Sequence, residues 1–325
     1  MKKHLLIATV AFLVTLMFTG ATNAQQIQVN KNIQHYIKTG NISGNAGSIG
    51  SDTMNNLMTL WLEGFKKYYP LVNIQIEGKG SSTAPPALIA GTAQFGPMSR
   101  KMKNEEIDKF EAKYGFKPTT IRSSMDALAV FVNKDNPLKC LSLEQVDAIF
   151  SKSRKRGFKE NITTWGQLGL KGKWKNKPIS IYGRNSASGT YGFYKEHVLK
   201  KGDFKDIVKE QPGSASVVQG ITNDLYGIGY SGIGYITSGV AALNLSEKLN
   251  GTCQDGNYDN VVTGKYPLSR YLYLNIAKNP SKKLDPLVKE FLKYVLSYEG
   301  QQIVIKDGYL PLSEKVVKEE LNKLD

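Results

Sequence analysis

One pattern constrains this chain more than any other: a short strand, a turn rich in Gly, Ser and Thr, and then a helix, repeated three times. Asn73–Glu77 alternates apolar and polar residues as a strand does, whereas Met54–Phe65 has the apolar spacing of an amphipathic helix. Ala127–Val132 is a continuous apolar run, which predicts a buried parallel strand. Strands that alternate with helices predict an α/β fold with parallel sheets. The three turns fall at 51–53, 80–83 and 184–190.

These turns offer the hydrogen-bond donors that bind oxyanions. Each presents hydroxyls and unpaired backbone N–H groups at a helix start, where the positive end of the helix dipole lies. Arg184 adds a planar guanidinium that can hold two oxygens of one anion, and Ser99-Arg100 supplies a further hydroxyl and guanidinium. A single turn of this kind is usually an ordinary helix cap. Together, however, the three turns and Arg184 predict a site for a tetrahedral oxyanion.

Length and charge narrow the classes of function. A chain of 325 residues predicts two domains, and 43 Lys and Arg against 28 Asp and Glu give a formal charge of +15. That charge favours an anionic partner: a small anion, a nucleic acid or an acidic lipid surface. The basic run Lys152–Lys159 is interpreted as a solvated loop, with docking to a permease or to anionic lipid as the alternative. Three His and two Cys are too few for a zinc or iron–sulfur site, so we expect no metal and no cofactor.

The first 24 residues have the layout of a secretory signal peptide. Lys2 and Lys3 precede an apolar stretch over Leu5–Gly20, and small residues lead to a cleavage site after about Ala24. An uncleaved membrane anchor is the alternative, but the apolar stretch is short for a membrane span. We therefore expect an exported mature chain. In an oxidising compartment its two cysteines, Cys140 and Cys253, can form a disulfide; two separate buried thiols are the alternative.

Several motifs follow one another in a specific order: Leu143-x-x-Val146-x-x-Ile149-Phe150 with Thr164-Trp165, Arg184-x-x-x-Ser188-Gly189-Thr190, Gly227-Ile228-Gly229-Tyr230, Leu296-Ser297-x-Glu299-Gly300-Gln301 and Gly308-Tyr309-Leu310-Pro311-Leu312. In order and spacing they resemble the periplasmic phosphate-binding proteins, the receptors of phosphate ABC importers. The second motif resembles the anion-binding turn of that family. The resemblance covers roughly Ser48 to Leu312, nearly all of the mature chain.

The resemblance implies a type 2 periplasmic binding protein fold of the α/β class. Two lobes, each a mostly parallel sheet flanked by helices, would be joined by hinge strands near Ala127–Val132 and Tyr266–Leu274. It also implies that the protein captures inorganic phosphate between the lobes and passes it to an ABC transporter permease in the inner membrane. We expect a periplasmic monomer without catalytic residues and without a nucleic-acid partner. The expected parts are a signal peptide at 1–24, lobe 1 at 25–130 plus 268–325, and lobe 2 at 131–267.

The phosphate contacts that the resemblance implies come from all three turns and from the Ser-Arg pair. One position departs from the family, because Ser99-Arg100 stands where well-known members keep an aspartate after Phe-Gly. Such an aspartate accepts a proton from hydrogenphosphate and repels sulfate. Asp52 is either a replacement acceptor or an ordinary N-cap, and we favour the N-cap. The full set is Ser51, Asp52, Thr53, Ser81, Ser82, Ser99, Arg100, Arg184, Ser188, Gly189 and Thr190.

Three other functions compete with a phosphate receptor. A receptor for another oxyanion, such as sulfate, would use the same turns. A secreted phosphate-ester hydrolase would need a catalytic cluster, yet only His35 and His197 remain in the mature chain and no Gly-x-Ser-x-Gly elbow occurs. An exported nucleic-acid or adhesion protein would be driven by the positive charge and would bind with steep salt dependence.

Overall fold

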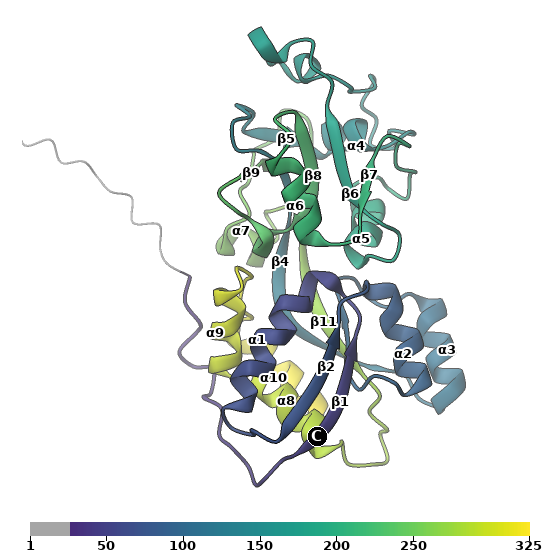
Figure 1. Cartoon of the computed structure of the whole chain (residues 1–325), viewed down its shortest axis with the longest axis vertical. Coiled ribbons are helices and arrows are strands. Elements are labelled where there is room, and N and C mark those ends of the chain that lie inside the picture. Colours follow the sequence, from purple (N-terminus) through teal and green to yellow (C-terminus); the bar gives the residue numbers. More distant parts are fainter. Residues whose placement is uncertain (1–26) are drawn as a thin grey trace, which may run out of the picture.

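The computed structural model describes residues 27–325 and consists of two lobes stacked along the long axis (Figure 1). The predicted signal peptide, 1–24, lies outside the described residues. The predicted α/β class and two-lobed architecture are confirmed. Within the part of the chain that the structure describes, no helix is both long and apolar enough to cross a membrane.

The lower lobe in Figure 1 contains the first strands and the last helices of the chain. Strands β1 and β2 pair in parallel, and Ser48 at the end of β1 also bridges to Phe95. Helix α1 buries Leu57, Met58 and Trp61 at the predicted helical spacing. The elements are β1 (Gly44–Ile49), β2 (Val72–Glu77), β3 (Gly96–Met98), α1 (Asn55–Lys66), α2 (Ala84–Ala90), α3 (Asn104–Tyr114), α8 (Pro286–Val295), α9 (Tyr298–Lys306) and α10 (Glu314–Leu321), with 3-10 helices at Asp52–Met54, Ser81–Thr83 and Asn322–Leu324.

The upper lobe is built from the middle of the chain. Strand β6 pairs in parallel with β7 and β8, and β5 pairs in parallel with β10. A disulfide joins Cys140, the first residue of β5, to Cys253, and the two Cα atoms are 6.2 Å apart. The elements are β5 (Cys140–Ser142), β6 (Ser180–Arg184), β7 (Lys209–Gln211), β8 (Gly227–Gly232), β9 (Val240–Ala242), β10 (Asn244–Ser246), α4 (Leu143–Phe150), α5 (Gly189–His197), α6 (Ser214–Thr222) and α7 (Tyr258–Val262), with 3-10 helices at Trp165–Leu168, Gly172–Trp174 and Ile233–Tyr235.

Strands β4 (Thr119–Asn133) and β11 (Ser269–Ile276) run between the lobes (Figure 1). The first part of β4, Thr119–Ala127, pairs antiparallel with β11, and its second part, Leu128–Asn133, pairs antiparallel with β8 and β9. The prediction of a parallel strand at Ala127–Val132 is therefore wrong. The run is apolar because β4 lies in the interior of a mixed sheet and is buried on both faces, and burial does not depend on the direction of the neighbouring strands.

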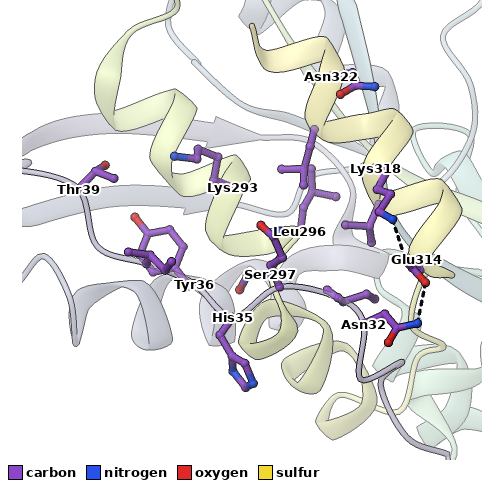
Figure 2. A pocket seen from close by; sticks show the side chains of 15 residues that line it. Asn32, His35, Tyr36, Thr39, Lys293, Leu296, Ser297, Glu314, Lys318 and Asn322 are labelled. Carbon is purple, nitrogen blue, oxygen red and sulfur yellow. Dashed lines mark hydrogen bonds and ion pairs between the residues drawn. The ribbon is translucent and has the colours of Figure 1, made fainter.

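The segment before β1 is packed onto the lower lobe. Val29, Ile33 and Tyr36 are buried, and the Tyr36 hydroxyl donates to Glu290 Oε2 at 2.8 Å. The backbone N–H of Tyr36 donates to Glu299 Oε2 at 2.8 Å. Figure 2 shows the groove of about 520 Å³ that this segment forms with α8 and α10. This N-terminal segment is therefore part of the folded lobe.

Candidate functional site

Five hydroxyl side chains from both lobes meet where the lobes face each other. Thr53 Oγ1 lies 2.9 Å from Thr190 Oγ1 and 3.5 Å from Ser214 Oγ. Ser99 Oγ lies 3.4 Å from Thr190 Oγ1 and 3.3 Å from Ser81 Oγ. All five side chains are buried. We call Thr53, Ser81, Ser99, Thr190 and Ser214 the hydroxyl cluster.

Two glycines allow the turns to approach each other this closely. Gly80, before Ser81, has a φ of +110°, a conformation that L side chains rarely adopt. A Cβ atom at Gly189 would lie 2.2 Å from Ser81 Oγ and 2.7 Å from Ser99 Oγ. A side chain at Gly189 would therefore push the lobes apart at the cluster.

Arg184, the last residue of β6, brings a buried positive charge to the cluster. Its side chain is 1% exposed, and NH1 donates to Ser214 Oγ at 2.6 Å. NH2 donates to the Pro212 carbonyl at 3.1 Å, and the Nε–H has no hydrogen-bond partner among the described residues. Burial lowers the pKa of the Arg184 guanidinium, because a charged group loses hydration inside the protein. A bound anion would compensate for that loss.

Asp52 connects the lobes instead of capping its own helix. Its Oδ1 accepts a hydrogen bond of 2.7 Å from the backbone N–H of Ser214, at the start of α6, and lies 3.2 Å from Arg184 NH1. The N-cap of the 3-10 helix before α1 is Ser51, and its side chain makes no capping hydrogen bond. The favoured N-cap interpretation of Asp52 is therefore wrong. The carboxylate faces the same guanidinium that an anion would use.

Two further predicted contacts belong to the cluster's surroundings. Ser51 is 2% exposed and its hydroxyl has no partner among the described side chains. Ser188 is the N-cap of α5, and its Oγ accepts from the backbone N–H of Thr190 at 3.1 Å and of Tyr191 at 3.3 Å. Both hydroxyls can still donate a hydrogen bond. Ser51 has no partner among the described residues, and Ser188 acts only as an acceptor in its two hydrogen bonds.

Arg100 and Ser82 form a different set of contacts. The Arg100 guanidinium donates to both carboxylate oxygens of Glu106, at 2.8 and 2.7 Å, and to Ser82 Oγ at 3.3 Å. Its positive charge is thus already neutralised by Glu106 within the lower lobe. Neither side chain has a hydrogen bond to the hydroxyl cluster.

Sequence reasoning missed a second buried guanidinium, Arg270 on β11. Its NH2 donates to Thr190 Oγ1 at 3.0 Å, its NH1 to the Ser99 carbonyl at 2.9 Å, and its Nε to Asp126 Oδ2 at 2.8 Å. Asp126 lies opposite Arg270 in the β4–β11 register. The available signal was Asp126 beside the apolar run Ala127–Val132 and Arg270 in another largely apolar strand, because a buried charge requires a partner of opposite sign. Ser214, at a helix start, was also missed.

No cluster of metal-ligating side chains and no histidine hydrogen bond is found at the hydroxyl cluster among the described residues. Among residues 27–325, no three His, Cys, Asp or Glu side chains are grouped so that they could hold a metal ion. His35 Nδ1 contacts Glu299 Oε1 at 2.7 Å, and the His197 ring lies against Phe193 with centroids 4.2 Å apart. What the site offers is hydroxyl donors, one guanidinium with a free N–H group and one carboxylate acceptor. That set can bind an oxyanion that carries a proton.

Sequence comparisons relate most or all of this chain to phosphate-binding proteins of bacteria. A family model described as "PBP superfamily domain" matches residues 40–299. The phosphate-binding protein PstS of Pseudomonas aeruginosa PAO1 is 52% identical over 324 residues, which cover 100% of this chain and 99% of the relative. The phosphate-binding protein PstS of Staphylococcus haemolyticus is 30% identical over 87% of this chain and 86% of its own length.

Solved structures have the same architecture. One, determined with bound phosphate, is of a protein from Clostridium perfringens assigned as a phosphate ABC transporter substrate-binding protein. It has a TM-score of 0.70 and 25% identity, and the match covers 83% of this chain and 100% of that chain. An ABC-type phosphate transport receptor from Vibrio cholerae, 22% identical, has a TM-score of 0.63 with coverage of 82% and 100%, and this likeness concerns the fold alone.

Proposed function

Because this chain belongs to the phosphate-binding protein PstS family within the PBP superfamily, we propose that it is a receptor that captures one inorganic phosphate between its lobes. The proposed lobes are 25–130 plus 268–325 and 131–267. The protein would be exported, with the signal peptide removed after about Ala24, and would deliver phosphate to an ABC importer in the membrane. Family membership favours this receptor over a phosphate-ester hydrolase.

One observation carries the proposal: hydroxyls from both lobes converge on the Arg184 guanidinium. Arg184 Nε is a buried donor without a partner among the described residues, which is costly unless an acceptor such as a phosphate oxygen is bound. We propose that phosphate is contacted by Ser51, Thr53, Ser81, Ser99, Arg184, Ser188, Gly189 and Thr190. Arg100 and Ser82 are left out because Glu106 already holds Arg100.

Asp52 is proposed as the acceptor that selects phosphate over sulfate. At neutral pH phosphate keeps at least one proton and can donate a hydrogen bond, whereas sulfate carries none. A carboxylate facing the anion therefore favours phosphate and repels sulfate. A serine hydroxyl at position 99 can rotate to donate instead, so it does not discriminate between the two anions by itself. The position of Asp52 beside Arg184 supports this role.

The proposal is tested by titration calorimetry on protein that has been unfolded and refolded to strip bound anion. Phosphate, arsenate, sulfate and molybdate are compared, and we expect one phosphate per chain with phosphate preferred over sulfate. Arg184→Ala should weaken phosphate binding by about 100-fold, since a charge-assisted hydrogen bond contributes about 1.5–3 kcal/mol.

Arg154→Ala is the matched control, because it removes the same charge from a half-buried position in a loop of the upper lobe. It should bind phosphate within about twofold of wild type, as expected for surface charges away from a site. If Arg184→Ala also stayed within that range, the anion would bind elsewhere. A preference for sulfate would favour the competing oxyanion receptor, and turnover of a chromogenic phosphate ester by metal-free protein would favour the hydrolase.

A further inference from the structure

The segment 171–177 of the upper lobe carries four lysines and no acidic residue. Lys171, Lys173, Lys175 and Lys177 are all exposed, and from Asn161 to Lys195 the sequence contains no Asp or Glu. Figure 1 shows the chain that leads into β6 at the upper end of the molecule, away from the lower lobe. We call residues 171–177 the lysine tip.

The lysine tip is an ordered loop anchored by tryptophan. Trp174 is 5% exposed and packs edge-on against Trp165, with ring centroids 5.9 Å apart, and against Tyr226 at 5.3 Å. The backbone N–H of Trp165 donates to the Lys177 carbonyl at 3.1 Å. A Cβ atom at Gly166 would lie 2.1 Å from the Lys175 carbonyl, so the two chain segments are in close contact. The backbone thus has little freedom left to lose when the tip binds a partner.

The charges of the tip have no carboxylate partner among the described residues, whereas several other cations of this lobe are paired. In this lobe, ion pairs join Lys152 to Asp206 at 2.6 Å and Lys195 to Asp203 at 2.8 Å. Arg156, in the basic run noted in the sequence, pairs with Glu247 at 3.0 Å. Within residues 27–325, no tip lysine has a carboxylate at ion-pair distance. All four tip lysines therefore present unpaired charge to solvent, whereas two cations of the basic run, Lys152 and Arg156, are paired.

We propose that the lysine tip binds the anionic phospholipid headgroups of the membrane that contains the ABC importer. The inference rests on the proposed function, because only that function brings the protein to a membrane. A permease that responds to closure has to contact both lobes. The tip lies at the far end of one lobe, so binding there leaves the lobes free to open and close. Each lysine near an anionic bilayer raises the partitioning of a protein onto that bilayer by about fivefold. At 0.1 M salt the Debye length is about 10 Å, so the attraction is short-ranged and the binding stays reversible.

Co-sedimentation of the whole protein with vesicles that contain phosphatidylglycerol tests the proposal, with pure phosphatidylcholine vesicles as the reference. The tip variant carries Lys171→Gln, Lys173→Gln, Lys175→Gln and Lys177→Gln. The matched control carries Lys66→Gln, Lys67→Gln, Lys109→Gln and Lys113→Gln, which removes the same charge from exposed positions of the lower lobe. We expect the tip variant to lose partitioning by at least about tenfold, the control to stay within about twofold, and high salt to release the wild type.

Three results would overturn the proposal: no binding of wild type to the anionic vesicles, equal binding of tip variant and wild type, or equal losses in both variants, which would indicate net charge alone. If wild type instead bound a DNA duplex through the tip and not vesicles, the surface would recognise nucleic acid. Calorimetry with phosphate on the same three proteins should give equal affinities. A wild type that bound vesicles but not phosphate would refute the proposed receptor and leave the lipid contact standing.

Discussion

On the upper side of the hydroxyl cluster, Arg184 lies 3.2 Å from Asp52 and still has a buried Nε–H without a hydrogen-bond partner among the described residues. Two other cations near the cluster, on its other side, are paired with carboxylates on that same side. Arg100 is held by Glu106 in the lower lobe, and Arg270, on the crossing strand β11, is held by Asp126. The lower lobe instead contributes hydroxyls and the Asp52 carboxylate. We therefore expect the upper lobe to contribute most of the attraction for an anion, and the lower lobe most of the selection among anions.

The lobes also differ in how they are held together. The upper lobe has the Cys140–Cys253 disulfide, which spans 113 residues of sequence. The lower lobe instead packs its N-terminal segment and its last three helices around Tyr36, whose hydroxyl contacts Tyr69 at 3.1 Å and Glu290 at 2.8 Å. The tryptophans report on the two lobes separately, since Trp61 lies in the lower lobe and Trp165 and Trp174 lie in the upper lobe.

The largest effect is expected from removing the disulfide. The double variant Cys140→Ser with Cys253→Ser should lower the free energy of unfolding of the upper lobe by about 4 kcal/mol, because a disulfide that closes a loop of this size restricts the unfolded chain strongly. Urea denaturation of Trp→Phe variants that keep tryptophan in one lobe measures this. Reduced wild type should behave like the double variant. Two free thiols in denatured, unreduced protein would contradict the bridge.

The next largest effect tests whether a paired cation still assists binding. Arg270→Lys keeps a positive charge opposite Asp126 but loses the two guanidinium N–H groups that donate to Thr190 Oγ1 and to the Ser99 carbonyl. Two hydrogen bonds of about 1 kcal/mol each correspond to about 30-fold weaker phosphate binding, measured by calorimetry. Arg122→Lys is the control, since Arg122 pairs with Glu319 and Glu320 in the lower lobe. Equal losses in both variants would mean that Arg270 acts only through stability.

A smaller effect is expected from the acidic contact of the lower lobe. Asp52→Asn should narrow the ratio of phosphate to sulfate affinity by about tenfold, because the amide no longer repels sulfate and an amide oxygen accepts less strongly than a carboxylate. Competition of labelled phosphate with sulfate measures the ratio. If neither wild type nor Asp52→Asn responded to millimolar sulfate, another acceptor would be doing the selection.

The smallest effect concerns Asp307, a carboxylate at the junction of the lobes that has no ion pair within residues 27–325. Burial raises the pKa of Asp307 to about 6, although Asn56 donates a hydrogen bond to it. The folded state therefore holds this proton more tightly than the unfolded state, and the associated stability is complete below about pH 4 and lost as pH rises through about 6.

Asp307→Asn should remove that part of the pH dependence. Relative to wild type, the variant should gain about 1 kcal/mol in free energy of unfolding between pH 4 and pH 7, a value reduced for partial exposure to solvent. Urea denaturation at the two pH values measures the difference. Asp285→Asn, at the N-cap of α8, is the control, because that carboxylate accepts from a backbone N–H of its own helix. Parallel pH profiles of wild type and Asp307→Asn would contradict the assignment.

Local patterns were sufficient to predict much of the fold. The apolar spacing of Met54–Phe65 corresponds to α1, and Asn73–Glu77 lies within β2. These features depend on neighbours a few residues apart, because the periods of helices and strands are local. The direction of pairing of β4 was predicted wrongly as parallel, since burial on both faces produces the same apolar run in a parallel and in an antiparallel sheet.

The sequence by itself determined the α/β class, the three turns and the presence of Arg184 at the end of a strand. Only the tertiary structure decided what these residues contact. Asp52 meets the backbone of Ser214 across 162 residues of chain, and Arg270 meets Asp126 across 144. A residue's secondary structure follows from its nearest neighbours, but the partner of a buried charge depends on the path of the whole backbone, because the side chain must satisfy whichever groups the fold places beside it.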